Sequence, residues 1–207
     1  MSLGCKLVAH SFNMNYLAHA YLSFNQPEIL VGNMISDFVK GKKQFEFPEN
    51  IHKGIMLHRS IDAFTDEHEI TKQAKIFFKP AVGLYAGAFV DVVYDHFLAC
   101  DTSEFINEGL LQFSLSVYKT LSDYAVLLPE KFALMFPYMK RDNWLYNYRT
   151  LNGTEKSFAG LARRAKYLET ANAAFDCLKN NYDELKQCYN AFFPAVKHFA
   201  YKQLYNH

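Results

Sequence analysis

The chain has 207 residues with a formal net charge of +1, and half of its residues are hydrophobic, which fits one domain with a sizeable core. The near balance of charge excludes bulk electrostatic attraction to nucleic acid. No apolar run reaches the roughly 18 residues of a membrane span, and the four scattered cysteines form no CxxC pair, which fits the reducing cytoplasm.

Helical periodicity dominates the chain, and strand patterns are nearly absent. Residues 1–13 precede Met14 and are expected to be a poorly ordered leader or extension. Residues 14–207 are predicted to form one all-α domain. The predicted helices cover 15–24, 28–39, 48–64, 66–78, 84–99, 103–128, 129–140, 153–167 and 168–205, the last as one or two helices with a break or kink at Pro194. A short element is expected around 144–148.

Helix boundaries are predicted from capping and turn residues. Ser103 is a plausible N-cap of its helix, and Asp66 either caps the helix that follows it or belongs to a functional cluster. Pro80 to Gly83 is expected to break the chain, and Asn152-Gly153 to form a turn.

A first cluster of metal-type side chains lies in the run HRSIDAFTD. His58 and Asp62 are four residues apart, so a helix presents both on one face. Arg59 lies beside them, and its planar guanidinium suits phosphate oxygens. The alternative is a surface salt-bridge cluster; for His58 and Asp62 the pattern favours function.

A second cluster, Asp91, Asp95 and His96, lies in the run DVVYDHFL, inside a helix that is apolar nearly all round. Aspartate is rarely buried unless it is paired. Asp91 and Asp95 share a face, whereas His96 lies about 100° away. The alternative is one exposed polar stripe, which the apolar flanks disfavour.

Two upstream residues complete a candidate metal site. His19 lies in an apolar helix, where a lone histidine is more often an ordinary core residue, and Asp37 lies near a helix C-terminus. Spread over four helices, His19, Asp37, His58 and Asp95 are predicted to surround one ion. The carboxylate content favours Mn²⁺ or Mg²⁺, with Fe²⁺ and Zn²⁺ as alternatives.

Basic residues follow Asp37 directly, at Lys40, Lys42 and Lys43, and are called the lysine rim below. A solvated face is the default interpretation of such a group. Beside a metal site, it would also suit an acidic or phosphate-bearing partner.

At these same residues the chain resembles the acyl carrier protein phosphodiesterase family. The resembling segments are MNYLAHAYLS (14–23), GNMISDFVKG (32–41), GIMLHRSIDAFTD (54–66) and DVVYDHFL (91–98), with a weaker echo in NWLYNY (143–148). The matching positions are His19, Asp37, His58, Arg59, Asp62, Asp66, Asp91, Asp95 and His96.

The resemblance implies a helix bundle distantly similar to HD-domain phosphohydrolases. It also implies Mn²⁺-dependent hydrolysis of the phosphodiester that joins 4′-phosphopantetheine to a serine of holo-acyl carrier protein. Asp62 or Asp91 is expected to activate the water, Arg59 to stabilise the phosphoryl charge, and His96 to donate a proton or support a neighbouring residue.

The substrate carrier is acidic, which gives the lysine rim a docking role. Two alternatives stay open: a metal-dependent phosphohydrolase acting on a nucleotide or another small phosphoester, and a non-enzymatic helical binding module whose His/Asp clusters are buried polar networks.

Overall fold

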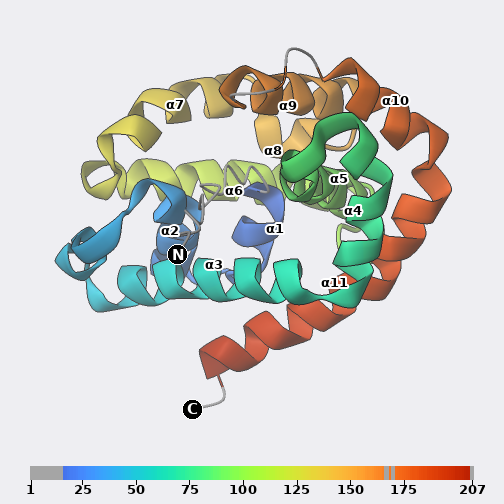
Figure 1. Cartoon of the computed structure of the whole chain (residues 1–207). Helices are drawn as coiled ribbons and strands as arrows, with labels where there is room; N and C mark the ends of the chain where they lie inside the picture. Colours follow the sequence, from blue (N-terminus) through green and yellow to red (C-terminus); the bar gives the residue numbers. More distant parts are fainter. Residues whose placement is uncertain (1–15, 166–167, 169–170, 206–207) are drawn as a thin grey trace, which may run out of the picture.

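A computed structural model describes residues 16–165, 168 and 171–205. All regular secondary structure in these residues is helical, as predicted. Figure 1 shows the helices packed together in a single body. The predicted extension over 1–13 lies outside the described residues. The α-helices are α1 (Tyr16–Tyr21), α2 (Pro27–Ile35), α3 (Glu49–Glu67), α4 (Glu69–Val82), α5 (Ala86–Ala99), α6 (Gly109–Asp123), α7 (Glu130–Arg141), α8 (Trp144–Asn147), α9 (Leu151–Arg164), α10 (Asn172–Asn180) and α11 (Tyr182–Tyr205). Short 3-10 helices are η1 (Ser36–Phe38), η2 (Gly41–Glu46), η3 (Gly83–Tyr85) and η4 (Ala125–Leu127).

Helix α2 is shorter than predicted. It ends at Ile35, and the chain continues as the 3-10 helix η1 before it becomes extended at Val39. Asp37 therefore lies in a tight turn rather than on the α-helix expected over 28–39. This turn moves the Asp37 carboxylate off the helical register of α2.

Helix α3 is longer than predicted, and the capping role considered for Asp66 is wrong. Asp66 lies in the last turn of α3, which ends at Glu67. The N-cap of α4 is His68, whose Nδ1 accepts a hydrogen bond from the Ile70 N–H. Asp66 is exposed and forms an ion pair with Lys75 at 2.6 Å.

Two prolines do not break their helices. Pro80 lies within α4, which continues to Val82, and α11 is continuous through Pro194. The break after α4 occurs at Gly83, which has a φ of +55°. Only glycine adopts this left-handed conformation at little cost.

Helix α6 begins at Gly109 rather than near Ser103. Both the backbone N–H and the hydroxyl of Ser103 donate to Asp101 Oδ1. Such local side-chain bonds compete with helix formation. The turn predicted at Asn152-Gly153 is also wrong, because both residues lie in the first turn of α9, where Thr150 accepts a bond from Gly153 N–H.

Helix α5 is buried on nearly every side, as its composition predicted, and forms the centre of the core. Helices α4 and α5 together span residues 69–99, a stretch long and apolar enough by composition to cross a membrane. In the structure Gly83 divides the stretch and α4 packs against α5. Packed core helices pass the same compositional test, so this is weak evidence for a membrane span.

Helices α2 and α3 are in very close contact, and this contact positions the site. A Cβ atom at Gly32 would overlap the Ile51 carbonyl oxygen, and one at Gly54 would overlap that of Ile29. Two glycines therefore allow the two backbones to touch. As a result, Asn33 of α2 faces His58 of α3.

Candidate functional site

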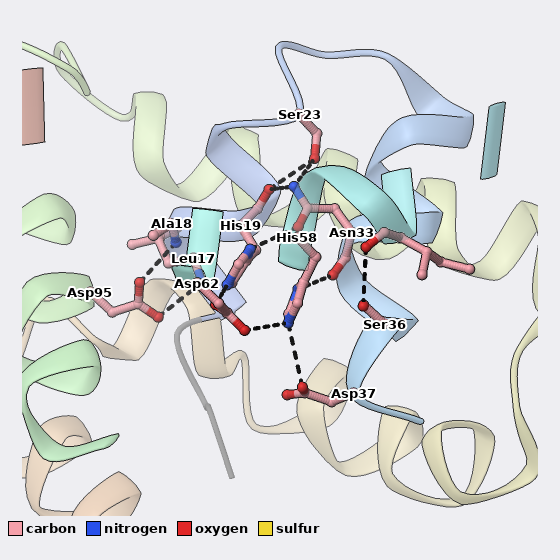
Figure 2. A network of polar contacts seen from close by, with 11 residues as sticks. Leu17, Ala18, His19, Ser23, Asn33, Ser36, Asp37, His58, Asp62 and Asp95 are labelled. Atoms are coloured by element: carbon pink, nitrogen blue, oxygen red, sulfur yellow. Dashed lines mark hydrogen bonds and ion pairs between the residues drawn. The ribbon is translucent and has the colours of Figure 1, made fainter. Parts of the chain in front are cut away.

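The structure brings together the side chains of His19 from α1 and of His58 and Asp62 from α3 (Figure 2), and these three residues form the His/Asp cluster. One possible ligand atom from each residue lies within 4.8 Å of the other two. Asp62 Oδ1 is 3.2 Å from His19 Nε2, and Asp62 Oδ2 is 3.3 Å from His58 Nε2. The two imidazoles stack with centroids 3.8 Å apart, so both Nε2 atoms point toward the same carboxylate.

Asn33 orients both imidazole rings. Its side-chain amide donates to the His19 carbonyl at 2.8 Å, which leaves Asn33 Oδ1 to accept from His19 Nδ1 at 2.7 Å. Its backbone carbonyl accepts from His58 Nδ1 at 2.7 Å. Because both Nδ1 atoms donate, both Nε2 atoms point into the cluster, where each carries a lone pair whenever its ring is neutral.

The cluster contains an electrostatic conflict. His19 Nε2 and Asp62 Oδ1 are buried and have no hydrogen-bond partner among the described residues, although they are 3.2 Å apart. Burial, together with the neighbouring His58, lowers the pKa of His19 and favours its neutral form. Two electron-pair acceptors then face each other, an arrangement that a proton or a cation must relieve.

His58 is the residue of the cluster whose protonated form the surroundings favour. Burial by itself would lower its pKa, but the carboxylates of Asp62 and Asp37 outweigh burial and raise it to about 10. The same pairing holds the pKa of Asp62 far below its usual range, despite burial. The donor set therefore attracts positive charge.

Asp37 lies at the edge of this cluster. Its Oδ1 is 3.4 Å from His58 Nε2, and its side chain is 25% exposed, against 19% for Asp62. The turn that carries Asp37 is attached to α3 by Arg59, which donates to the Val39 carbonyl at 3.0 Å and to Gln44 Oε1 at 2.6 Å. Arg59 thus contacts protein oxygens in this structure instead of presenting its whole fork to a phosphate.

Asp95, predicted as a metal ligand, lies elsewhere. Its two oxygens accept the backbone N–H groups of Leu17 and Ala18 at 3.0 and 2.8 Å, at the start of α1. Burial raises its pKa, and these two bonds oppose the rise. Asp95 is outside the group of side chains that meet within 4.8 Å. It therefore fixes α1, and with it His19, instead of facing the cluster.

Asp91 is buried on α5, one turn before Asp95, and makes no hydrogen bond or ion pair within the described part of the chain. Burial first, and then the charges of Asp62 and Asp66, raise its pKa well above the usual range. Its neutral acid form is therefore favoured, which disagrees with the expected role of accepting a proton from water.

His96 is separated from the cluster and has a partner at each ring nitrogen. Nδ1 donates to the Tyr148 carbonyl at 2.7 Å, and Nε2 is 2.9 Å from the Tyr182 hydroxyl. Burial lowers the pKa of His96. These contacts join α5 to α8 and α11, so the described partners of His96 lie outside the group formed by His19, His58 and Asp62.

The lysine rim is exposed to solvent along the start of η2, directly after the turn that carries Asp37. The sequence did not reveal the role of Asn33. Its only indication was an amide side chain within the apolar run that precedes Asp37. An amide at such a position is indistinguishable from an ordinary core polar residue until its partners are known.

Comparison with known proteins identifies the family of this chain. The family model described as acyl carrier protein phosphodiesterase matches residues 14–196. A relative of that name in Yersinia pestis is 30% identical, over 92% of this chain and 100% of the relative. Relatives of the same name in an Enterobacter species and in Escherichia coli O6:H1 are 31% and 29% identical, each over 88% of this chain and 95% of the relative. No solved structure matches the chain, and the distant likeness to HD-domain phosphohydrolases stays a prediction. The match of the family model to most of the chain, including every residue of the His/Asp cluster, means that this protein belongs to the acyl carrier protein phosphodiesterase family.

Proposed function

We propose that this chain hydrolyses the phosphodiester between 4′-phosphopantetheine and a serine of holo-acyl carrier protein, which yields the apo carrier and 4′-phosphopantetheine. Support comes from family membership and from relatives with this name over nearly their whole length. The cytoplasm is the proposed compartment, because Cys100, Cys177 and Cys188 are free thiols.

A divalent cation is proposed as the cofactor, held by His19, His58 and Asp62. The observation that carries this proposal is the contact between His19 Nε2 and Asp62 Oδ1, two buried acceptors that lack a partner in the described residues. Mixed imidazole and carboxylate donors suit Mn²⁺, with Mg²⁺, Fe²⁺ and Zn²⁺ as alternatives. When bound, such an ion would polarise a phosphoryl oxygen and make water more acidic.

The chain's own residues then have distinct tasks. Asp62 is assigned a ligand role in place of Asp95, because only Asp62 faces both imidazoles. Asp37 is the more exposed carboxylate of the two near His58, and we assign it to accept the proton of the attacking water. Arg59 keeps that carboxylate in place through the Val39 carbonyl.

The lysine rim is the proposed docking surface for the acidic carrier. It lies in the segment that follows Asp37, so a carrier that docks there would bring its modified serine close to the cluster. A small phosphoester would not need this surface, which separates the proposal from the nucleotide alternative.

The test is to incubate holo-carrier with the purified protein and Mn²⁺ and to measure the intact mass of the carrier. Loss of the phosphopantetheine mass is expected, together with recovery of apo carrier. EDTA-treated protein and an Asp62→Asn variant are the controls and should both be inactive. Hydrolysis of generic phosphodiesters with no action on the carrier would support the small-substrate alternative instead.

A further inference from the structure

An open groove of about 810 Å³ lies between helices α7, α8 and α9. These three helices lie together at the top of Figure 1, above α1 and α2, which carry His19 and Asn33. Small-molecule sites commonly have volumes of roughly 300–1,000 Å³. The groove is therefore large enough for an extended small molecule, and none of the roles assigned above uses it.

The groove is basic. Arg141, Lys156, Arg163 and Arg164 line it, and its one acid, Asp142, is held by Arg141 at 2.7 Å. None of the other three cations forms an ion pair within the described residues. Lys156, Arg163 and Arg164 thus provide cationic groups without a direct ion-pair partner in the described residues, which can bind an anion.

Asn143 supplies a polar atom that lacks a partner. Its Oδ1 is buried and has no hydrogen-bond partner among the described residues, and the residue lines the groove. Its backbone is left-handed, with φ of 42°, a conformation that non-glycine residues adopt at a cost. A turn of the Asn143 side chain would bring this acceptor to the groove, where the amide N–H of a ligand would satisfy it.

Arg164 connects the groove with the His/Asp cluster. Burial lowers the pKa of its guanidinium, and the Asp37 carboxylate is among the groups that oppose this lowering. Asp37 Oδ1 is itself 3.4 Å from His58 Nε2. Arg164 is the last residue of α9, whereas Asn143 directly precedes α8, so the two line different parts of the groove.

We propose that this groove binds the 4′-phosphopantetheine arm of the substrate, with Arg164 at the phosphate and Asn143 accepting an amide N–H. This inference rests on the proposed function. The arm is an extended chain with a phosphate at one end and two amides along its length, which matches an anion site and an orphaned acceptor in one groove. The carrier itself would stay outside, on the side of the lysine rim.

The test uses the full chain and two free probes, 4′-phosphopantetheine and pantetheine, with binding measured by calorimetry. Asn143→Gly keeps the left-handed backbone and should weaken both probes by about 3- to 10-fold. Arg164→Gln should weaken 4′-phosphopantetheine by about 10-fold or more and leave pantetheine unchanged. Lys202→Gln, at an exposed residue of α11 outside the groove, is the matched control and should change neither.

Filling the groove provides an independent variant. Ala159 lines the groove and is half-buried on α9, so Ala159→Trp should abolish binding of both probes. Thermal unfolding of each variant confirms that the fold is kept.

Three results would overturn the inference. The first is wild-type protein that removes the arm from holo-carrier yet binds neither probe. The second is Asn143→Gly and Ala159→Trp variants that bind both probes like Lys202→Gln. The third is that the groove variants raise KM for the carrier but bind both probes as the wild type does. That result would mean that the groove binds the acidic surface of the carrier instead of the arm. Failure of the proposed function is distinct, because it appears as wild-type protein that leaves holo-carrier intact.

Discussion

Replacing Asn33 with alanine removes the residue that orients both imidazoles through different atoms. The His19 ring depends on the Asn33 side chain, whereas the His58 ring depends only on the Asn33 backbone carbonyl. Asn33→Ala therefore releases one ring and keeps the anchor of the other. Such a variant tests the role of ring orientation without altering any proposed metal ligand.

The magnitude follows from the bonds that are lost. Asn33 is fully buried and its side chain makes three hydrogen bonds, to His19 Nδ1, to the His19 carbonyl and to Ser23 Oγ. Each contributes about 1 kcal/mol net, and the orphaned ring N–H adds a further penalty, so a loss of about 2–4 kcal/mol is expected. For a chain of this size that lowers Tm by roughly 4–16 °C. Loss of an orienting partner also weakens metal binding by roughly 10- to 100-fold.

The assay pairs urea unfolding with Mn²⁺ titration, and Ser23→Ala is the matched control. Ser23 donates to the same His19 carbonyl at 2.8 Å but does not touch the ring. Its removal should cost about 1–2 kcal/mol of stability and leave Mn²⁺ affinity unchanged. The reasoning is refuted if Asn33→Ala is destabilised but binds Mn²⁺ as tightly as Ser23→Ala.

Three further outcomes are expected. Gly54→Ala should lower the free energy of unfolding in urea by about 1–3 kcal/mol, because its Cβ would overlap the Ile29 carbonyl. Gly87→Ala should cost much less, because its Cβ would meet the flexible Lys75 side chain at 3.3 Å and Asp66 Oδ1 only at 3.8 Å. Equal losses in the two variants would contradict the close-approach argument. Metal-free protein should lose a few kcal/mol of stability as pH rises from about 6.5 toward 10. The pKa of His58 is raised to about 10 in the folded chain, so its protonation stabilises the fold fully only below the pKa that His58 has in the unfolded chain. A His58→Gln variant with the same dependence of stability on pH, measured by urea unfolding, would exclude this cause. Reversing the charges of the lysine rim should raise KM for the carrier and leave Mn²⁺ affinity unchanged, whereas unchanged kinetics would reject that surface.

Local pattern was sufficient for much of the fold. Apolar periodicity predicted the all-α class, the boundaries of α7 and the buried state of α5. Spacing alone placed His58 and Asp62 on one face of α3, because i and i+4 residues of any helix share a face. Helix ends were predicted less well where a side chain competed locally, as Ser103 and Asp101 do ahead of α6.

The sequence by itself determined which polar groups lie on a buried helix face, because helical spacing fixes which residues share that face. What only the tertiary structure decided is which group meets which. Asp95 and Asp62 are both acidic residues of largely buried helical faces, yet one caps α1 and the other faces two imidazoles. That difference depends on how closely α2 approaches α3 at two glycines and on where α1 begins, and contacts between segments distant in the chain leave no trace in local spacing.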